Sequence, residues 1–298
     1  MNRMRGPDVA RLLALAVIWS ASFVFIRVLA PPLGPVWTAT LRVLVAGVAL
    51  VGWFAATGFD ADVRRHWRAY LFVGLVNSAA PFLLFSWAAL TLPASYLVIL
   101  NAASPMFTAI AAAAWLGERL SGAKLAGLAV GAAGVALVSR AGPLEPTPAV
   151  VAAVAASLAA ALCYALAGVW LKRHGAGLKP VAIAGWSQLG AAALLLPVAA
   201  ATPMPGPVTP AVVANLLALA LVCSGAAYLL YYRLIRDIGP TRAMTVTFLM
   251  PALGMLWGVL FLGETVNATM LAGAALVIVG TAAVLRPPRS ARQLGLGR

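Results

Sequence analysis

Few side chains in this sequence have the type and placement needed for catalysis. The seven acids all fall at or beyond the ends of long apolar runs: Asp8, Asp60, Asp62, Glu118, Glu145, Asp237 and Glu264. Both histidines fall in polar connections, and both cysteines fall inside apolar runs. An enzyme site needs a nucleophile with a base, a metal cluster or an acid pair, and ATP use needs a GxxxxGKS or GxxxxGKT loop. Since neither pattern occurs, we expect no enzyme, no metal and no cofactor.

Two prolines inside apolar runs indicate where a ligand would find polar atoms. Pro105 cannot donate to the Asn101 carbonyl, and Pro251 cannot donate to the Thr247 carbonyl. Carbonyls freed in a bilayer must be satisfied by side chains, water or a ligand. We therefore expect helix breaks at Pro105 and Pro251 beside a binding site, with Asn101 and Ser104 near the first and Thr245 and Thr247 near the second. The alternative is a packed kink satisfied by Ser or Thr hydroxyls.

Aromatic side chains recur on matching helix faces. Positions spaced i, i+4 and i+7 share a face, and two such sets stand 146 positions apart: Ser78, Phe82 and Phe85, then Ser224, Tyr228 and Tyr231. Such residues suit paired gates of a substrate path, with an interfacial aromatic belt as the alternative. Asn77, an amide in mid-run, is expected to face the bundle interior and to bond a helix or a ligand.

Together these signals predict a substrate site built from side chains of several runs. The candidates are Trp19, Ser22, Asn77, Phe82, Asn101, Tyr164, Tyr228 and Thr245. Core packing is the alternative for the aromatic members. Arg42 is the only cation well inside a run; it would hold a carboxylate, bond carbonyls or extend to the outer headgroups, and a structural role is favoured.

The elements that position these residues must lie in lipid. The 298 residues are 63% hydrophobic and 9% charged, with mean hydropathy +0.98, whereas soluble domains carry about 25% charged residues. The net charge of +14 comes from basic residues that mostly stand between apolar runs. That placement is typical of membrane topology, so no nucleic-acid partner is expected.

Ten apolar runs are long enough to span a bilayer. They cover residues 9–29, 35–57, 67–91, 94–117, 122–139, 149–172, 180–201, 210–235, 240–262 and 267–285. If the N-terminus is cytoplasmic, eighteen basic residues lie inside and only Arg27 and Arg140 lie outside. The positive-inside rule then predicts cytoplasmic N- and C-termini.

The chain also repeats itself. At an offset of 146, Pro105 falls on Pro251, the LGE ending at Glu118 falls on the LGE ending at Glu264, and LAG at 125–127 falls on LAG at 271–273. Each copy holds five runs, so the second enters the membrane from the opposite side. We predict an all-α integral membrane protein with two inverted five-helix repeats, 1–140 and 149–286, and a basic cytoplasmic tail, 287–298. Such repeats are common in secondary transporters, and the two glutamates are expected to cap the turn that follows each LGE.

Two five-helix halves, each carrying Pro, LGE, LAG and Gly in that order, resemble the drug/metabolite transporter superfamily, and its ten-helix EamA-type members in particular. The resemblance covers nearly the whole chain. It implies alternating access by a secondary transporter, as in bacterial exporters of amino acids, including aromatic ones.

We therefore expect a multi-pass protein of the cytoplasmic (inner) membrane that exports small metabolites, most plausibly amino acids. Because no carboxylate lies within a span, no buried acidic proton relay is expected. The alternative is efflux of drugs or other lipophilic or aromatic solutes. The expected partners are a small-molecule substrate and membrane lipid, and a monomer is compatible with the pattern.

Overall fold

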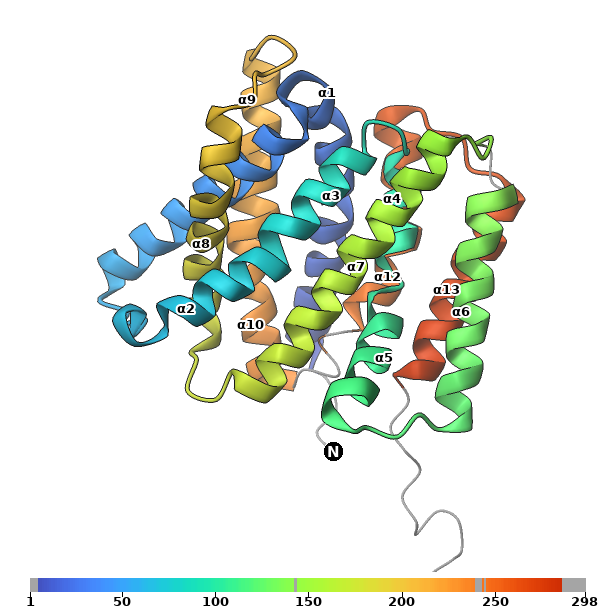
Figure 1. Cartoon of the computed structure of the whole chain (residues 1–298), viewed down its shortest axis with the longest axis horizontal. Coiled ribbons are helices and arrows are strands. Elements are labelled where there is room, and N and C mark those ends of the chain that lie inside the picture. The colour runs from blue at the N-terminus through green and yellow to red at the C-terminus, as the bar shows by residue number, and fades with distance from the viewer. Residues whose placement is uncertain (1–4, 142–143, 239–242, 244, 286–298) are drawn as a thin grey trace, which may run out of the picture.

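The computed structural model describes residues 5–141, 144–238, 243 and 245–285, and these form a bundle of helices without a strand (Figure 1). The basic tail 287–298 lies outside the described residues. The helices are α1 (Gly6–Thr57), α2 (Val63–Gly74), η1 (Leu75–Ala79), α3 (Ala80–Ala88), α4 (Ala94–Asn101), α5 (Ser104–Leu116), α6 (Gly122–Ala141), α7 (Pro148–His174), α8 (Pro180–Ala200), α9 (Pro210–Leu217), η2 (Ala218–Ala226), α10 (Ala227–Ile238), α12 (Val246–Leu262) and α13 (Ala268–Val284).

The surface of the bundle suits lipid. Seven helical stretches of the described chain are long and apolar enough to cross a membrane, and α12 and α13 are shorter apolar helices. Large apolar side chains are exposed on them, including Phe261 at 70% and Leu260 at 62%. A water-soluble monomer rarely exposes so much apolar surface, so the chain is a multi-pass membrane protein.

Helix α1 contains two of the predicted spans, joined at a sharp break. Gly34 has φ +76° and ψ 159°, which no helix adopts, and Pro31, Pro32 and Pro35 around it lack the N–H that a helix needs. The break separates a first arm (6–33) from a second arm (35–57), and Figure 1 shows α1 bending there. These arms correspond to the runs 9–29 and 35–57.

The two matched prolines have different surroundings. Around Pro105 the helix is interrupted, since α4 ends at Asn101 and α5 begins at Ser104. Pro251 instead lies inside α12, which continues to Leu262. The expected helix break is therefore present in the first half and absent at the corresponding place in the second.

Two π-helical segments occupy corresponding positions in the two halves. At the 146-residue offset, η1 (Leu75–Ala79) falls on residues 221–225, which lie within η2 (Ala218–Ala226). A π-helix widens the turn and is frequent at functional sites. Each segment interrupts a helix that faces the interior, with Asn77 in η1 and Cys223 in η2.

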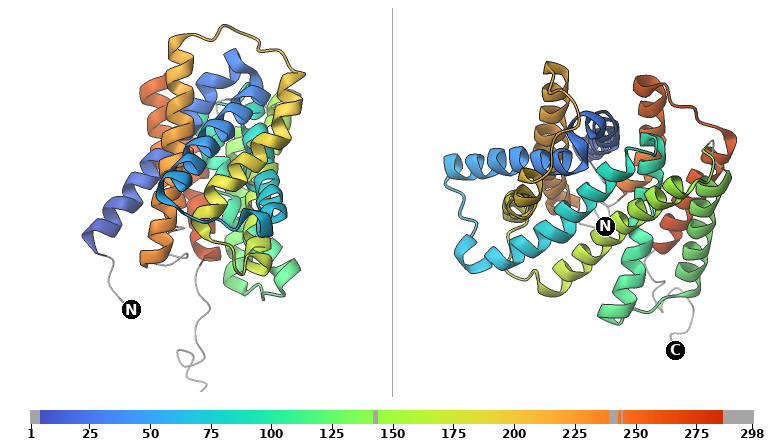
Figure 2. Two further views of the ribbon diagram at one scale, coloured as in Figure 1. Left: turned by 90° about the vertical axis from the view of Figure 1, so that its left-hand side faces the viewer. Right: turned by 45° about the horizontal axis from the view of Figure 1, so that its top comes forward.

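Helices α6 and α13 pack closely through glycines. A Cβ added at Gly127 would lie 2.7 Å from the Gly280 carbonyl oxygen, and one at Gly134 would lie 2.7 Å from the Gly273 carbonyl oxygen. Along this contact the residue numbers of α13 fall as those of α6 rise, so the two helices run antiparallel. Figures 1 and 2 show this pair at one edge of the bundle.

Contacts at one end of the bundle hold the two halves together. The Glu264 carboxylate accepts from the backbone N–H groups of Ala94 at 2.6 Å and Ser95 at 3.0 Å, at the start of α4. At the same end, within the first half, Arg27 donates to the Ala89 carbonyl after α3. The Gly206 N–H donates to the Pro32 carbonyl at 2.9 Å. We call this the tied end.

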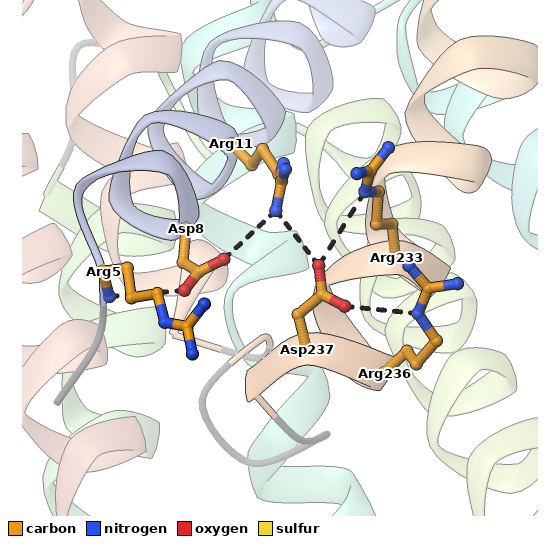
Figure 3. A network of polar contacts seen from close by, with 6 residues as sticks. All are labelled: Arg5, Asp8, Arg11, Arg233, Arg236 and Asp237. Carbon is orange, nitrogen blue, oxygen red and sulfur yellow. Dashed lines mark hydrogen bonds and ion pairs between the residues drawn. The ribbon is translucent and has the colours of Figure 1, made fainter. Parts of the chain in front are cut away.

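The opposite end carries the start of α1 and a network of charges. Arg11 pairs with Asp8 at 3.1 Å and with Asp237 of α10 at 3.0 Å, and Asp237 also meets Arg233 and Arg236 (Figure 3). These side chains are partly exposed, and such pairs contribute little to stability individually. Their arrangement still joins the start of α1 to the end of α10.

Candidate functional site

A cavity of about 480 Å³ lies within the bundle and is lined from both halves of the chain. Both arms of α1, η1, α3, α4, α5, α7, α8, η2, α10 and α12 contribute to it. No residue of α6 or α13 contributes to the lining among the described residues. That pair therefore lies outside the described cavity wall.

Aromatic side chains form much of the cavity wall. Trp19 meets Tyr228 edge-on at 6.2 Å between ring centroids, and its centroid lies 5.1 Å from that of Tyr231. On another side Phe85 stacks on Tyr164 at 6.3 Å and 25°. Rings in contact hold one another's orientation, so the cavity offers a broad apolar surface of defined shape.

Only a few polar groups interrupt this wall. Asn77 Nδ2 lies 3.5 Å from the Tyr228 hydroxyl oxygen, at the outer limit of a hydrogen bond. Asn101 Oδ1 is buried and has no hydrogen-bond partner among the described residues. The Ser22 hydroxyl donates to the Trp19 carbonyl at 2.6 Å. An apolar cavity with few polar groups is typical of small-molecule sites.

The structure brings nearly all predicted site residues together. Of the eight substrate-binding candidates, the cavity is lined by Trp19, Ser22, Asn77, Phe82, Asn101, Tyr164 and Tyr228. Thr245 is the exception: it caps α12, and Thr247 lines the cavity instead. Residues two apart point to different sides of a helix, so only Thr247 of the two threonines near Pro251 reaches the cavity.

The two prolines lie outside the cavity lining. Pro105 borders a separate hollow of about 160 Å³, together with Glu118, Lys124 and Lys172. The carbonyl of Asn101 accepts from the Ser104 hydroxyl at 2.6 Å. That carbonyl is thus satisfied locally, which is the packed-kink alternative.

Glu118, in the connection from α5 to α6, faces two lysines. Its carboxylate accepts from Lys172 Nζ at 2.6 Å and lies 3.8 Å from Lys124 Nζ. The hydrogen bond from Lys172, with the positive charge of both lysines, lowers the pKa of Glu118 below its ordinary value of 4.5. The two LGE motifs therefore end in different contacts, since Glu264 caps a helix.

Arg42 is the residue whose position the sequence did not predict. It lines the cavity, is only 6% exposed, and does not extend to the headgroups. It is the only charged residue in the described lining. The signal available in the sequence was its isolation within an apolar run, because an ionisable residue there usually faces the interior.

The absence of acids from the described cavity wall limits its chemistry. The lining holds no Asp, Glu, His or Lys, and no group of three potential metal ligands occurs among the described residues. What the cavity offers is binding: aromatic faces, amides, hydroxyls and one guanidinium.

A lipid-facing helical bundle around such a cavity is the architecture of a membrane transporter. The EamA-like transporter family model matches residues 9–140 and again 151–286. The chain therefore belongs to the EamA-like transporter family.

Comparison with curated proteins gives full-length relatives. A probable terminal-alkyne amino-acid exporter of Streptantibioticus cattleyicolor is 26% identical over 276 residues, 92% of each chain. A probable amino-acid metabolite efflux pump of Escherichia coli is 27% identical, over 93% of this chain and 94% of its own. One crystal structure superposes with TM-score 0.66 at 22% identity, over 98% of this chain and 99% of its own, and supports the fold.

Proposed function

We propose that this protein exports amino acids or closely related metabolites across the cytoplasmic membrane by alternating access. The observation that carries the proposal is the cavity between the halves. Its aromatic wall would cover an apolar side chain, while Asn77, Asn101 and Arg42 would meet the polar part of a zwitterion. The exporters among the relatives support the substrate class.

We further propose ten spans in two inverted repeats, with both termini cytoplasmic. The two arms of α1 add one span to the long helices, and the family model matches once in each half. The contact between α6 and α13 supports an inverted arrangement of the two repeats, because corresponding residues of the two helices contact each other in both directions. Gly127 meets Gly280 while their repeat counterparts, Gly273 and Gly134, meet each other, which is the pattern of a two-fold axis.

In the proposed orientation, the structure has its cavity directed to the cytoplasm. The lining continues to Gly175, Leu178 and Pro180, at the connection of α7 to α8. The outer end is the tied end, where Glu264 caps α4. Export would then require the tied end to open and the cytoplasmic end to close.

The cavity also bears on how transport is driven. Since its described lining has no acid or histidine, we propose that transport needs no buried carboxylate as a proton relay. The second candidate function is efflux of lipophilic or aromatic solutes, and the aromatic wall of Trp19, Phe85 and Tyr164 favours it.

The test is transport by the purified protein in proteoliposomes, using a panel of labelled amino acids with and without an imposed pH gradient. We expect exchange of at least one amino acid without the gradient. Strict dependence on the gradient would refute the proposal that transport needs no buried proton relay. Transport of a lipophilic dye, with no amino acid transported, would favour the second function.

A further inference from the structure

The central cavity contains a buried cation without an acidic partner among the described residues. Arg42 Nε donates to Ser224 Oγ at 2.9 Å, and its guanidinium carbon lies 3.7 Å from the centroid of the Phe82 ring. No ion pair between described residues includes Arg42. Within that part of the chain, the guanidinium makes one hydrogen bond, although it carries five N–H donors.

These contacts hold the guanidinium without neutralising it. The hydroxyl of Ser224 and the face of Phe82 offset part of the cost of removing the cation from water, but a buried charge remains costly unless it is paired. Its terminal N–H groups form a planar fork that matches the two oxygens of a carboxylate. A ligand carboxylate would therefore supply the missing partner.

An acceptor lines the same cavity as Arg42. Asn101 Oδ1 is buried without a hydrogen-bond partner among the described residues, which is uncommon for a buried polar atom. Arg42 lies seven residues after Pro35, and Asn101 lies seven residues after Ala94. Both segments start at the tied end, so each residue lies about 10 Å from that end along its own helix at 1.5 Å per residue.

We infer that Arg42 binds the carboxylate of the transported solute and that Asn101 accepts a hydrogen bond from its ammonium group. The inference rests on the proposed function and names the substrate class: a zwitterionic amino acid, with its side chain against the aromatic wall. The guanidinium fork pairs with the carboxylate, and the ammonium of the zwitterion donates to the neutral oxygen of Asn101. A lipophilic cation would be repelled by Arg42.

The experiment compares three ligands that share one skeleton: phenylalanine, 3-phenylpropanoate, which lacks the ammonium, and 2-phenylethylamine, which lacks the carboxylate. Binding to the full-length protein in detergent is measured by titration calorimetry. We expect phenylalanine to bind most tightly and 2-phenylethylamine most weakly. Arg42→Gln is expected to weaken binding of both carboxylates at least about tenfold. Asn101→Ala is expected to reduce the affinity for phenylalanine to the affinity for 3-phenylpropanoate.

Two further variants separate ligand binding from a structural role of Arg42. Ser224→Ala removes the bond to Nε and keeps the charge, so the order of the three ligands should persist. Arg42→Lys keeps the charge without the fork and should weaken the carboxylates less than Arg42→Gln. If Arg42→Gln does not fold, the wild-type order and Arg42→Lys decide the matter.

The inference is overturned if wild type binds 2-phenylethylamine as tightly as 3-phenylpropanoate, if it binds none of the three, or if folded Arg42→Gln keeps its affinity for carboxylates. Wild-type protein that binds carboxylates as expected but transports no amino acid would refute the proposed function alone. Transport by wild type together with unchanged carboxylate binding by Arg42→Gln would refute the inference alone.

Discussion

The two halves of this chain share sequence at an offset of 146 residues, yet they differ at one charged position of the cavity and at the ends of the bundle. At the α6–α13 seam the corresponding glycines make equivalent contacts. In the cavity the counterpart of Arg42 is Gln188, which does not line it. At the ends, Glu264 caps a helix while its counterpart Glu118 pairs with lysines. The seam is thus equivalent in the two halves, whereas the charged position of the described cavity lining and the contacts at the two ends differ between them.

The largest expected effect is at the symmetric seam. A Cβ at Gly127 or Gly134 would meet the backbone of α13 at 2.7 Å, and overpacking typically costs about 1–3 kcal/mol per site. The two sites are separate, so Gly127→Ala with Gly134→Ala should cost about 2–6 kcal/mol if their effects add. Folded yield and melting temperature in detergent measure this loss.

The matched control for the seam is Gly52→Ala in α1. A Cβ there has nothing within 4 Å, and alanine favours a helix over glycine by about 1 kcal/mol. Folded yield should stay equal or rise. The scaffold role of the seam is refuted if the double variant has the same melting temperature as Gly52→Ala and wild type.

The next effect is in the cavity, where function should fail before folding does. Tyr228→Ala removes a ring that meets Trp19 and a hydroxyl beside Asn77. Losing a bonding partner of the ligand costs about 1–3 kcal/mol of binding. Transport should fall while folded protein is retained. Leu128→Ala, in α6 outside the described lining, serves as the control, and normal export by Tyr228→Ala with failure of Leu128→Ala would exclude this cavity as the site.

Sequence patterns predicted the parts of this molecule that depend on the spacing of apolar and aromatic residues and on the prolines and glycines that interrupt helices. Apolar runs located the long helices, and the proline cluster near Gly34 separated the arms of α1. Aromatic residues at i, i+4 and i+7 identified Phe82 and Tyr228 because a shared face needs no tertiary information. The position of Arg42 was not predictable in this way, since extension to headgroups and burial against Phe82 depend on how other helices pack. The π-helices and the continuity of α12 through Pro251 likewise depend on packing.

A smaller effect separates the two glutamates. Glu264→Gln replaces the carboxylate by a neutral amide. The hydrogen bonds that it accepts from the Ala94 and Ser95 N–H groups at the start of α4 therefore become weaker. Loss of such a cap costs about 0.5–2 kcal/mol, and the tied end should open more readily. A cysteine at Ile26, which is buried beside Arg27 at the tied end and lines the cavity, should become more reactive to an impermeant thiol reagent added on the proposed outer side, in a background without Cys163 and Cys223. An unchanged labelling rate would contradict the closing role of Glu264.

The smallest effect is at Glu118, and it should depend on pH. Lys172 and Lys124 lower the pKa of Glu118 in the folded state, so its contribution to stability is present above its ordinary value of 4.5 and is lost as pH falls through the lower folded value. The side chain is 36% exposed, and an exposed pair contributes less than about 1 kcal/mol. Glu118→Gln should therefore lower the melting temperature slightly at neutral pH and low salt, and the difference from wild type should vanish in acid or at high salt. If the difference persists in acid, Glu118 has a role beyond its lysine pairs and corresponds more closely to Glu264 than this structure indicates.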